Sequence, residues 1–248
     1  MEISIKNKFG EKLDAVVEGR MDADTTVVFV HGLGTSKDEN GLFVDIAASL
    51  ADKFRIVRFD FSGYGKSEGR QEDVDFHKQA EDLESVLKYV RQNYSGQINI
   101  LAHSMGTSVV SLLSPEGITK TIYSGIPSTD YLDSMARMKD RISSRGGTVN
   151  EAGISFYPRK DGAVQKIGPT FWRVRREFDP VVALRKYAPQ TQLTIFKSLQ
   201  DEITGNEGFA AYKDMKELNY MEVNGTHGFS DPADRQAVIK IIMGILEK

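Results

Sequence analysis

The sequence predicts an α/β protein with a mostly parallel central sheet that is flanked by helices. Three observations support this prediction. Short apolar stretches alternate with longer segments of helical periodicity along most of the 248 residues, which implies strand–helix–strand crossovers and therefore parallel strands. Residues 27–30, Val-Val-Phe-Val, are apolar throughout, as in a strand that is buried on both faces. At residues 98–107 an apolar strand turns sharply into a helix at Ser104.

The first half of the chain begins with a hairpin and then alternates between strands and helices. In the predicted strands the apolar residues are continuous, whereas in the predicted helices they recur at spacings of three and four. The carboxyl ends of the parallel strands should meet at one edge of the sheet, where ligands bind in such folds. The elements expected are a hairpin over residues 3–20, a strand at 27–30, a helix at 43–50, a strand at 56–59, a helix at 76–90 and the strand that begins at residue 98.

The second half continues this alternation after one long interruption at residues 127–178. Inside the interruption, residues 154–167 predict a small hairpin with Asp-Gly in its turn. The other elements expected are a strand at 118–123, a strand at 192–199, a helix marked by Phe209, Tyr212, Met215 and Leu218, a strand at 220–223 and a helix marked by Val238, Ile241, Ile242 and Ile245.

We interpret residues 127–178 as a lid inserted into a single domain that spans residues 1–248. The interruption is too long for a simple connection, and it leaves the sheet just after a strand that neighbours the one leading to Ser104. It contains ten Lys and Arg but only six Asp and Glu, a net charge of +4, whereas the whole chain has −3. This charge suggests an anionic substrate. The alternative is a solvated surface segment.

The composition limits the classes of function. Hydrophobic residues make up 40% of the chain, the net charge is −3 and cysteine is absent. The lack of cysteine removes disulfides, thiolate metal sites and a cysteine nucleophile, and the acidic balance gives no electrostatic case for nucleic acid. No apolar run is long enough for a membrane span, and no secretory leader is recognised. We therefore expect a cytoplasmic protein without a nucleic acid partner.

Ser104 is the candidate nucleophile. It is the centre of Ala-His-Ser-Met-Gly at residues 102–106, a pattern typical of a nucleophile elbow between a strand and a helix. Gly106 is small where strand and helix pass close to each other, and Ala102 replaces the usual first glycine, adding only one methyl group. The alternative is an ordinary serine that caps the helix.

A serine hydroxyl needs an adjacent base, and four histidines are available. His31 begins a His-Gly turn, His77 lies on a helix, and His103 should point away from Ser104 because it is its neighbour on the turn. His227 lies in a glycine-flanked loop after the last strand. Its place in the order Ser, Asp, His favours it as the base.

The base in turn needs a carboxylate that orients its ring and stabilises the imidazolium. Asp201 directly follows a strand, at the edge of the sheet where Ser104 is expected. We therefore favour Asp201, and Glu202, Asp231 and Asp130 remain as alternatives.

Two backbone N–H groups are expected to bind the developing oxyanion. One belongs to Met105, at the start of the helix after Ser104, and the other to Leu33, after the His-Gly pair. Both are main-chain roles, so the side chains there matter little. Since no His–carboxylate group has metal-ligand spacing and no nucleotide-binding motif is complete, we expect neither a metal nor a cofactor.

Together these motifs resemble those of α/β-hydrolase-fold serine esterases, and they are most similar to those of small intracellular feruloyl/cinnamoyl esterases. The resemblance implies the α/β-hydrolase fold with a lid after the sixth strand. It also implies metal-free hydrolysis of a small-molecule ester through an acyl-enzyme. The motifs that carry it are residues 31–34, 60–67 and 102–106, Asp201, and Gly-Thr-His-Gly-Phe at residues 225–229.

The resemblance also implies which residues determine substrate specificity. In the feruloyl group the insertion builds the acyl pocket, which implies that Tyr157, Phe171 and Trp172 contact the substrate; the alternative is that they pack the lid against the sheet. The family often has a proline shortly after the triad aspartate, where this chain has Ile203 and Thr204. Monoacylglycerol-lipase-like, aminopeptidase and acyltransferase members share the motifs, as do non-catalytic binding proteins. The sequence is also compatible with a homodimer.

Overall fold

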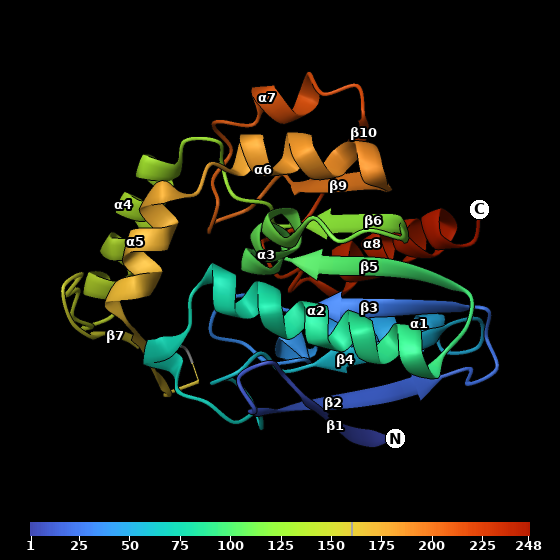
Figure 1. The fold of residues 1–248 in the computed structure, drawn as a ribbon. Coiled ribbons are helices and arrows are strands. Elements are labelled where there is room, and N and C mark those ends of the chain that lie inside the picture. The colour runs from blue at the N-terminus through green and yellow to red at the C-terminus, as the bar shows by residue number, and fades with distance from the viewer. Residues whose placement is uncertain (160) are drawn as a thin grey trace.

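The computed structural model describes residues 1–159 and 161–248, and a sheet of eight strands forms the centre of this part (Figure 1). The strands are β1 (Glu2–Lys6), β2 (Lys12–Gly19), β3 (Thr25–Val30), β4 (Arg55–Phe59), β5 (Gln97–His103), β6 (Ile118–Ser124), β9 (Gln192–Ser198) and β10 (Leu218–Val223). Their order is β1-β2-β4-β3-β5-β6-β9-β10. β2 pairs antiparallel with β1 and β4, and the other neighbours are parallel. The predicted mostly parallel α/β sheet is confirmed.

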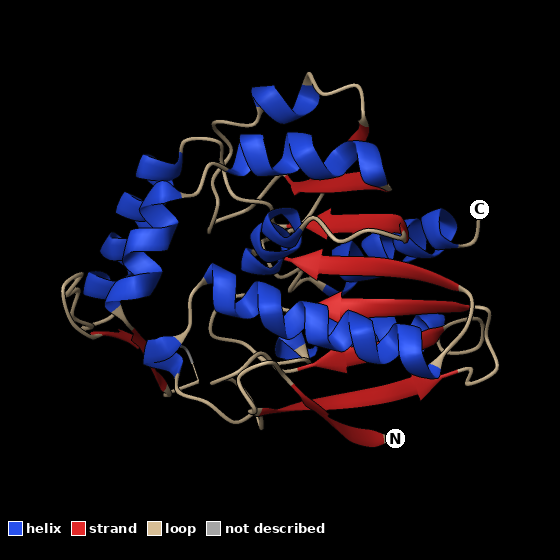
Figure 2. Ribbon diagram, in the orientation of Figure 1, coloured by secondary structure: helices blue, strands red, loops and turns tan. Residues whose placement is uncertain are grey.

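Helices cover both faces of this sheet (Figure 2). They are α1 (Leu42–Leu50), α2 (Phe76–Asn93), α3 (Met105–Leu113), α6 (Pro180–Tyr187), α7 (Ala210–Lys213) and α8 (Pro232–Leu246), with short 3-10 helices at Glu39–Gly41, Gln71–Asp73 and Ala188–Gln190. Buried residues of α2, α3 and α6 form one hydrophobic core with the sheet, and those of α1 and α8 form a second core. In Figure 1, α2 and α3 accordingly lie in front of the strands, and α8 lies behind them.

Capping residues in the sequence determine where two of the helices begin. Asp75 precedes α2 and accepts a hydrogen bond from the N–H of Lys78 at 2.9 Å. Asp231 precedes α8, accepts from the N–H of Ala233 at 2.8 Å, and is followed by Pro232 in the first turn. An acidic cap followed by proline is a favoured helix start because it satisfies N–H groups that have no partner within the helix.

The parallel register brings the functional loops to one edge of the sheet. Val30, the last residue of β3, lies opposite Ala102 near the end of β5. Ser198 and Val223, the last residues of β9 and β10, also lie opposite each other. The loops that follow these strands therefore leave the sheet side by side, at the edge where ligands bind in open α/β sheets.

The helix expected around residues 209–218 is only partly formed. Its helical part is the single turn α7, and Leu218 instead begins β10, where it pairs with Leu193. Phe209, Tyr212 and Met215 are buried in the core as their spacing predicts. The prediction was wrong in extent because parallel pairing with β9 claims the end of the segment, and tertiary contacts override local periodicity.

Residues 127–178, which we call the inserted segment, lie between β6 and α6 and form no part of the main sheet. They contain α4 (Tyr131–Ser144), α5 (Pro169–Glu177) and the antiparallel hairpin of β7 (Ser155–Pro158) and β8 (Val164–Ile167). In Figure 1, α4, α5 and β7 lie on the side to which the arrows of β3 and β5 point. The inserted segment therefore lies beyond the carboxyl ends of the parallel strands.

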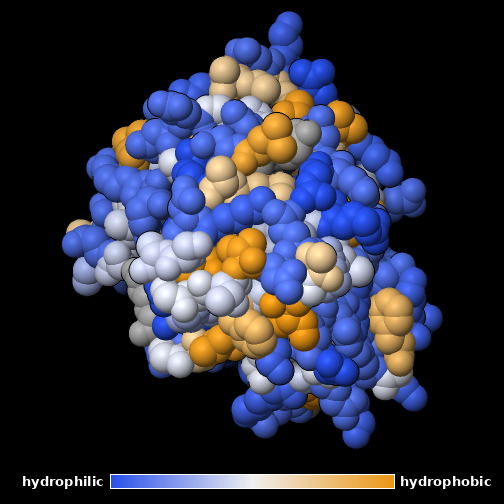
Figure 3. Space-filling model, turned by 90° about the vertical axis from the view of Figure 1, so that its left-hand side faces the viewer, coloured by the Kyte–Doolittle hydropathy of each residue, from blue (hydrophilic) through white to orange (hydrophobic). Residues whose placement is uncertain are grey.

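The inserted segment is apolar toward the main body and largely polar outside. Met138, Ile142 and Val174 are buried in a hydrophobic cluster that also contains Phe76 of α2 and Met105 of α3. Figure 3 shows the outer face of this side of the molecule, where hydrophobic patches are scattered among hydrophilic atoms. The described helices include none with the length and apolarity that crossing a membrane requires.

Gly106 provides a test of the packing beneath the serine turn. A Cβ at this position would lie 2.4 Å from the carbonyl oxygen of Val30 and 2.8 Å from that of His31. We expect Gly106→Ala to lower the free energy of unfolding by about 1–3 kcal/mol, because the backbones of α3 and β3 must move apart. Urea denaturation followed by circular dichroism measures this change.

Gly244→Ala is the matched control, because Gly244 lies on α8 and none of the described residues packed around it comes within 4 Å of an added Cβ. This variant should be neutral, or more stable by up to about 1 kcal/mol through helix propensity. Equal stability of the two variants would contradict the close approach of α3 to β3.

Candidate active site

Ser104 lies on a strained turn between β5 and α3. Its backbone has φ 53° and ψ −125°, a combination that residues other than glycine rarely adopt. Its N–H donates a hydrogen bond to the carbonyl oxygen of Ser124 at 2.8 Å. The turn directs the hydroxyl of Ser104 into a cavity of about 460 Å³ between the sheet edge and the inserted segment. This is the geometry of a nucleophile elbow.

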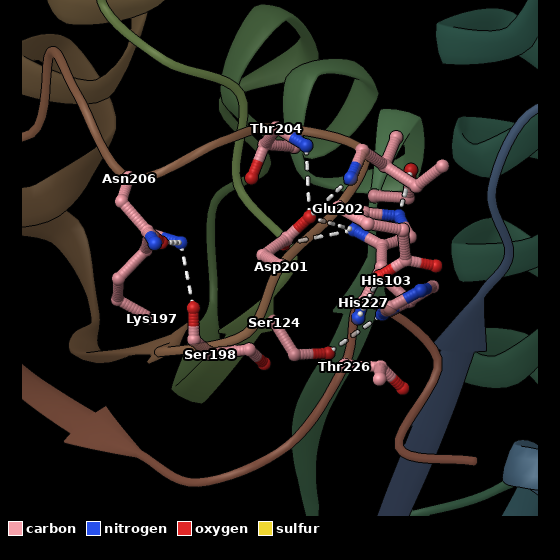
Figure 4. Close-up of polar contacts among 12 residues, drawn as sticks. His103, Ser124, Lys197, Ser198, Asp201, Glu202, Thr204, Asn206, Thr226 and His227 are labelled. Carbon is pink, nitrogen blue, oxygen red and sulfur yellow. Dashed lines mark hydrogen bonds and ion pairs between the residues drawn. The ribbon is translucent and has the colours of Figure 1, made fainter.

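The structure brings Ser104, His227 and Asp201 together. Nε2 of His227 lies 2.9 Å from Oγ of Ser104. Nδ1 of the same ring lies 2.9 Å from Oδ2 and 3.1 Å from Oδ1 of Asp201. Figure 4 shows the carboxylate of Asp201 directed at the ring of His227. The carboxylate selects the tautomer that carries its proton on Nδ1, which leaves Nε2 able to accept the proton of the serine hydroxyl.

Asp201 is held in its ionised form by its hydrogen bonds. The side chain is buried, and Oδ1 accepts hydrogen bonds from the N–H groups of Ile203 at 2.9 Å and Thr204 at 2.8 Å. Burial alone would raise the pKa of Asp201, but His227 and the N–H of Thr204 together keep this pKa far below its usual value. Ile203 and Thr204, which stand where the resemblance led us to expect a proline, thus supply the donors.

Two arginines of α4 fix the loop that carries Asp201. Arg137 donates to the carbonyl oxygen of Thr204 at 3.1 Å, and Arg141 donates to that of Ile203 at 3.1 Å. The same two residues of the loop therefore hold Asp201 through their N–H groups and α4 through their carbonyl groups. The inserted segment and the acid loop form one connected unit.

The alternative carboxylates have other contacts. Glu202 accepts a hydrogen bond from the backbone N–H of His227 at 3.0 Å, so it fixes the loop rather than the ring. Asp231 caps α8, and Asp130 caps α4 by accepting from the N–H of Asp133 at 2.9 Å. The ring of His227 is oriented by Asp201.

Two of the three remaining histidines, His31 and His103, are buried in structural contacts, whereas His77 is exposed on α2. Nε2 of His31 accepts a hydrogen bond from the N–H of Phe61 at 3.0 Å, and burial lowers the pKa of His31 to about 4. Nδ1 of His103 lies 2.9 Å from Oγ of Ser124, and burial, with the charge of His227 adding to it, lowers the pKa of His103 well below its usual value. Both rings are neutral at physiological pH. Nδ1 of His103 is engaged by Ser124, and its ring packs against that of His227, with 4.7 Å between the ring centres.

Leu33 and Met105, whose backbone N–H groups are the expected oxyanion donors, lie at the cavity. Both residues line the cavity, and within the described residues no acceptor is bonded to either N–H group. Met105 is the first residue of α3, where an N–H has no partner inside the helix. A Cβ on Gly32 would lie 3.0 Å from Cβ of Ser104, so only glycine lets this loop approach the serine so closely.

Glu39 is a buried acid beside this loop that the sequence did not single out. It accepts hydrogen bonds from the N–H of Gly32 at 2.5 Å and from the hydroxyl of Thr35 at 3.0 Å. Burial raises the pKa of Glu39 to about 7, although both donors act in the opposite direction. Its neighbours in sequence, Asp-Glu-Asn-Gly at residues 38–41, are typical of an exposed turn, so no sequence signal could have shown its burial.

Two of the three aromatic residues expected to contact the substrate line the cavity. They are Tyr157 of β7 and Phe171 of α5. Trp172 does not line it; this side chain is 1% exposed, and its indole N–H donates to Oγ of Ser155 at 2.9 Å. Adjacent residues of a helix point about 100° apart, so Phe171 and Trp172 cannot both face the cavity. The expectation for Trp172 is therefore corrected to packing within the inserted segment.

The charged residues of the cavity wall are mainly arginines. They are Arg141, Arg145, Arg159, Arg175 and Arg235. The net charge of residues 127–178 predicted an excess of positive charge but not where it lies. Across residues 1–159 and 161–248, no three His, Asp or Glu side chains are grouped so that they could hold a metal ion.

Comparisons with known proteins point to one fold. A family model described as alpha/beta hydrolase fold matches residues 25–120. Est1E from Butyrivibrio proteoclasticus, solved with ferulic acid bound, has a TM-score of 0.75 at 20% identity, covering 99% of this chain and 100% of its own. The Pyrococcus furiosus esterase Pf2001 has a TM-score of 0.77 at 17% identity, covering 100% and 89%.

A curated relative matches over a shorter stretch. The 2-hydroxy-6-oxo-6-(2'-aminophenyl)hexa-2,4-dienoic acid hydrolase of Metapseudomonas resinovorans is 24% identical over 102 residues. The match covers 40% of this chain and spans only about a third (34%) of the length of that relative. At these levels of sequence identity, the similarities establish the fold alone.

Glu39 gives a prediction for the pH dependence of stability. Its folded-state pKa of about 7 lies above the value of 4.5 usual for glutamate, so between these pH values the folded chain binds more protons than the unfolded chain. The contribution of Glu39 to stability is full below pH 4.5 and is lost as the pH rises through 7, by at most about 1.4 kcal/mol per pH unit. Glu39→Gln does not titrate, so its stability relative to the wild type should rise over this range.

Urea denaturation of both proteins at several pH values between 4 and 8 measures the difference. Glu217→Gln, at an exposed position, is the control and should show a constant difference from the wild type. A constant difference for Glu39→Gln as well would contradict the raised pKa of Glu39.

Proposed function

Since the chain has the α/β-hydrolase fold, we propose that it is a serine carboxylic-ester hydrolase that works through an acyl-enzyme. One observation carries this proposal: Oγ of Ser104 lies 2.9 Å from Nε2 of His227, whose Nδ1 lies 2.9 Å from Asp201. A serine hydroxyl is a weak nucleophile unless a base of this kind accepts its proton. Ser104 and His227 line a cavity large enough for a small ester, and Asp201 lies buried behind the ring of His227.

In the first half of the proposed reaction, Oγ of Ser104 attacks the ester carbonyl carbon while Nε2 of His227 takes the hydroxyl proton. The ionised Asp201 stabilises the imidazolium that forms. The carbonyl oxygen gains the negative charge and accepts hydrogen bonds from the N–H groups of Leu33 and Met105. Removing one donor of this kind typically costs about 2.7–4 kcal/mol of transition-state stabilisation. When the carbonyl re-forms, the alcohol leaves with the proton from His227.

In the second half, water replaces the alcohol. His227 takes a proton from the water, whose oxygen attacks the acyl carbon, and the same two N–H groups bind the new oxyanion. The collapse of this intermediate breaks the bond to Ser104, which regains its proton from His227. The acid product leaves, and the free enzyme is restored without any further reactant.

The substrate class that we propose is a feruloyl, cinnamoyl or other small acyl ester. Two features support it. Tyr157 and Phe171 provide aromatic surface in the cavity wall, and the fold likeness includes Est1E with ferulic acid bound. We further propose that the inserted segment, within one domain of residues 1–248, covers the site and selects the acyl group.

Ser104→Ala should abolish ester hydrolysis, lowering kcat by about 10³-fold or more because the nucleophile is lost. A fluorophosphonate probe should label the wild-type protein at Ser104 and should not label this variant or His227→Ala. Peptide mapping by mass spectrometry locates the label. Labelling at another serine, or full esterase activity in Ser104→Ala, would refute the mechanism.

A substrate panel distinguishes the proposed activity from its alternatives. Methyl ferulate and p-nitrophenyl acyl esters of increasing length test the esterase and monoacylglycerol-lipase-like functions, and aminoacyl anilides test a peptidase. Transfer of the acyl group to an added alcohol in preference to water would indicate an acyltransferase. Saturable binding with no turnover of any activated ester would indicate a non-catalytic binding protein on this fold.

A further inference from the structure

Four arginines of the inserted segment line the cavity without a carboxylate partner. They are Arg141, Arg145, Arg159 and Arg175. In the described part of the chain, none of these four forms an ion pair. Arg137, Arg173 and Arg176 of the same segment, which do not line the cavity, pair with Asp133, Glu177 and Glu151. The cavity thus concentrates the arginines that lack a counter-charge.

Neutral oxygens hold these guanidinium groups in position. Arg175 donates to the hydroxyl of Ser134 at 2.7 Å, and Arg141 donates to the carbonyl oxygen of Ile203 at 3.1 Å. A guanidinium has five N–H donors, so most of them are not used by these contacts. Nε of Arg141 is buried and has no acceptor within the described residues. The donors are therefore oriented but unsatisfied.

Arg141 and Arg175 come from different helices, α4 and α5, and repel each other across the cavity wall. Burial, together with the charge of Arg141, lowers the pKa of Arg175 to about 10. Two like charges that are partly removed from water destabilise the structure unless an anion joins them. A ligand that carries an oxyanion would supply the missing charge and accept the unused N–H groups.

The acidic residues of the cavity wall do not fill this role. Glu39 accepts from Gly32 and Thr35, and Glu202 accepts from the N–H of His227. Asp161 belongs to the exposed turn after β7, where it accepts from the N–H of Ala163 at 3.0 Å.

Apolar surface adjoins the guanidinium group of Arg175. The guanidinium carbon of Arg175 lies 5.9 Å from the ring centre of Phe76, and Phe171 and Met138 complete this part of the wall. Such a surface suits an organic molecule with an anionic end better than a bare, strongly hydrated ion.

We propose that Arg141 and Arg175 bind an oxyanion, a carboxylate or a phosphate, that the substrate carries at a distance from its reactive ester. This inference rests on the proposed function, and it narrows the substrate class to small esters with an anionic group. Guanidinium forks recognise carboxylate and phosphate oxygens in pairs, so the two arginines would orient the substrate as well as attract it. The inserted segment has a net charge of +4, and its four arginines without an ion pair line the cavity, where they would attract such a substrate.

Matched substrates test the proposal by kinetics. Monomethyl adipate carries a carboxylate, its carboxamide analogue is neutral and of the same shape, and the methyl ester of 5-phosphooxypentanoic acid carries a phosphate. Hydrolysis at constant pH is followed by titration of the released acid. We expect kcat/KM of the wild type to be at least about 10-fold higher for one of the two anions than for the carboxamide, as charged hydrogen bonds predict. Which anion is preferred distinguishes carboxylate from phosphate.

Arg175→Gln should bring this ratio close to one, mainly through KM, and Arg175→Lys should restore part of it because the charge is kept and the fork is lost. Arg173→Gln is the matched control, because Arg173 lies on the same helix but pairs with Glu177 outside the cavity. It should leave the ratio unchanged. A wild-type ratio near one, with the neutral ester still hydrolysed, would overturn the inference and leave the proposed function standing.

Binding provides a readout that does not need turnover. Calorimetric titration of Ser104→Ala with adipate, adipamide and inorganic phosphate should show binding of an anion and not of adipamide. Adding Arg175→Gln should weaken that binding about 10-fold or more, whereas adding Arg173→Gln should not. If no ester is hydrolysed but anion binding depends on Arg175, the oxyanion site stands, whereas the proposed function and the ester substrate fail. Equal binding with and without Arg175 would overturn the inference.

Discussion

At Ser104 the backbone adopts φ 53°, and much of the surrounding structure serves to keep it there. A non-glycine residue in this region costs on the order of 1–3 kcal/mol, so it persists only where the neighbours leave no alternative. On one side the N–H of Ser104 is bonded to β6, and on the other the contact of Gly106 with β3 prevents α3 from moving. Because β3 is fixed in the same way, its loop approaches the serine closely and brings Leu33 to the cavity wall. The nucleophile and its proposed oxyanion donors are therefore positioned by one packing arrangement.

Burial has opposite consequences for the titratable groups around this turn. It keeps His31 and His103 neutral, so neither competes with His227 for the serine proton. It also favours the neutral form of Glu39, which limits negative charge next to the place where an oxyanion would form. Asp201 is equally buried but stays ionised, because His227 and two N–H groups compensate for the lost water. Of these two buried acids, Glu39 and Asp201, Asp201 is thus the one that stays charged, and it faces the ring of His227.

The sequence predicts the position of a residue best where that residue follows the end of a strand. Ser104, Asp201 and His227 each follow a strand, and parallel pairing brings strand ends together whatever the details of packing. Residues whose role depends on the direction of the side chain could not be predicted as well from the sequence. Trp172 is next to Phe171 but packs inside the inserted segment instead of lining the cavity. Glu39 is buried in what reads as a surface turn, and the arginines of α4 and α5 show charge in the sequence without showing which of them lack partners. These are properties of tertiary contacts, which periodicity does not encode.

The contacts between α4 and the loop after β9 bear on how such proteins diversify. Arg137 and Arg141 bind the carbonyl groups of Thr204 and Ile203, whose N–H groups hold the carboxylate of Asp201. A chimera that exchanged residues 127–178 alone for those of a relative would remove the partners of both carbonyl groups and loosen the acid. The inserted segment is thus not structurally independent. We expect it to be exchanged successfully between proteins only together with the loop after β9. Exchanging the inserted segment and this loop together can change the cavity while Asp201 keeps its contact with His227. Exchanging only one of them changes the cavity and also disturbs that contact.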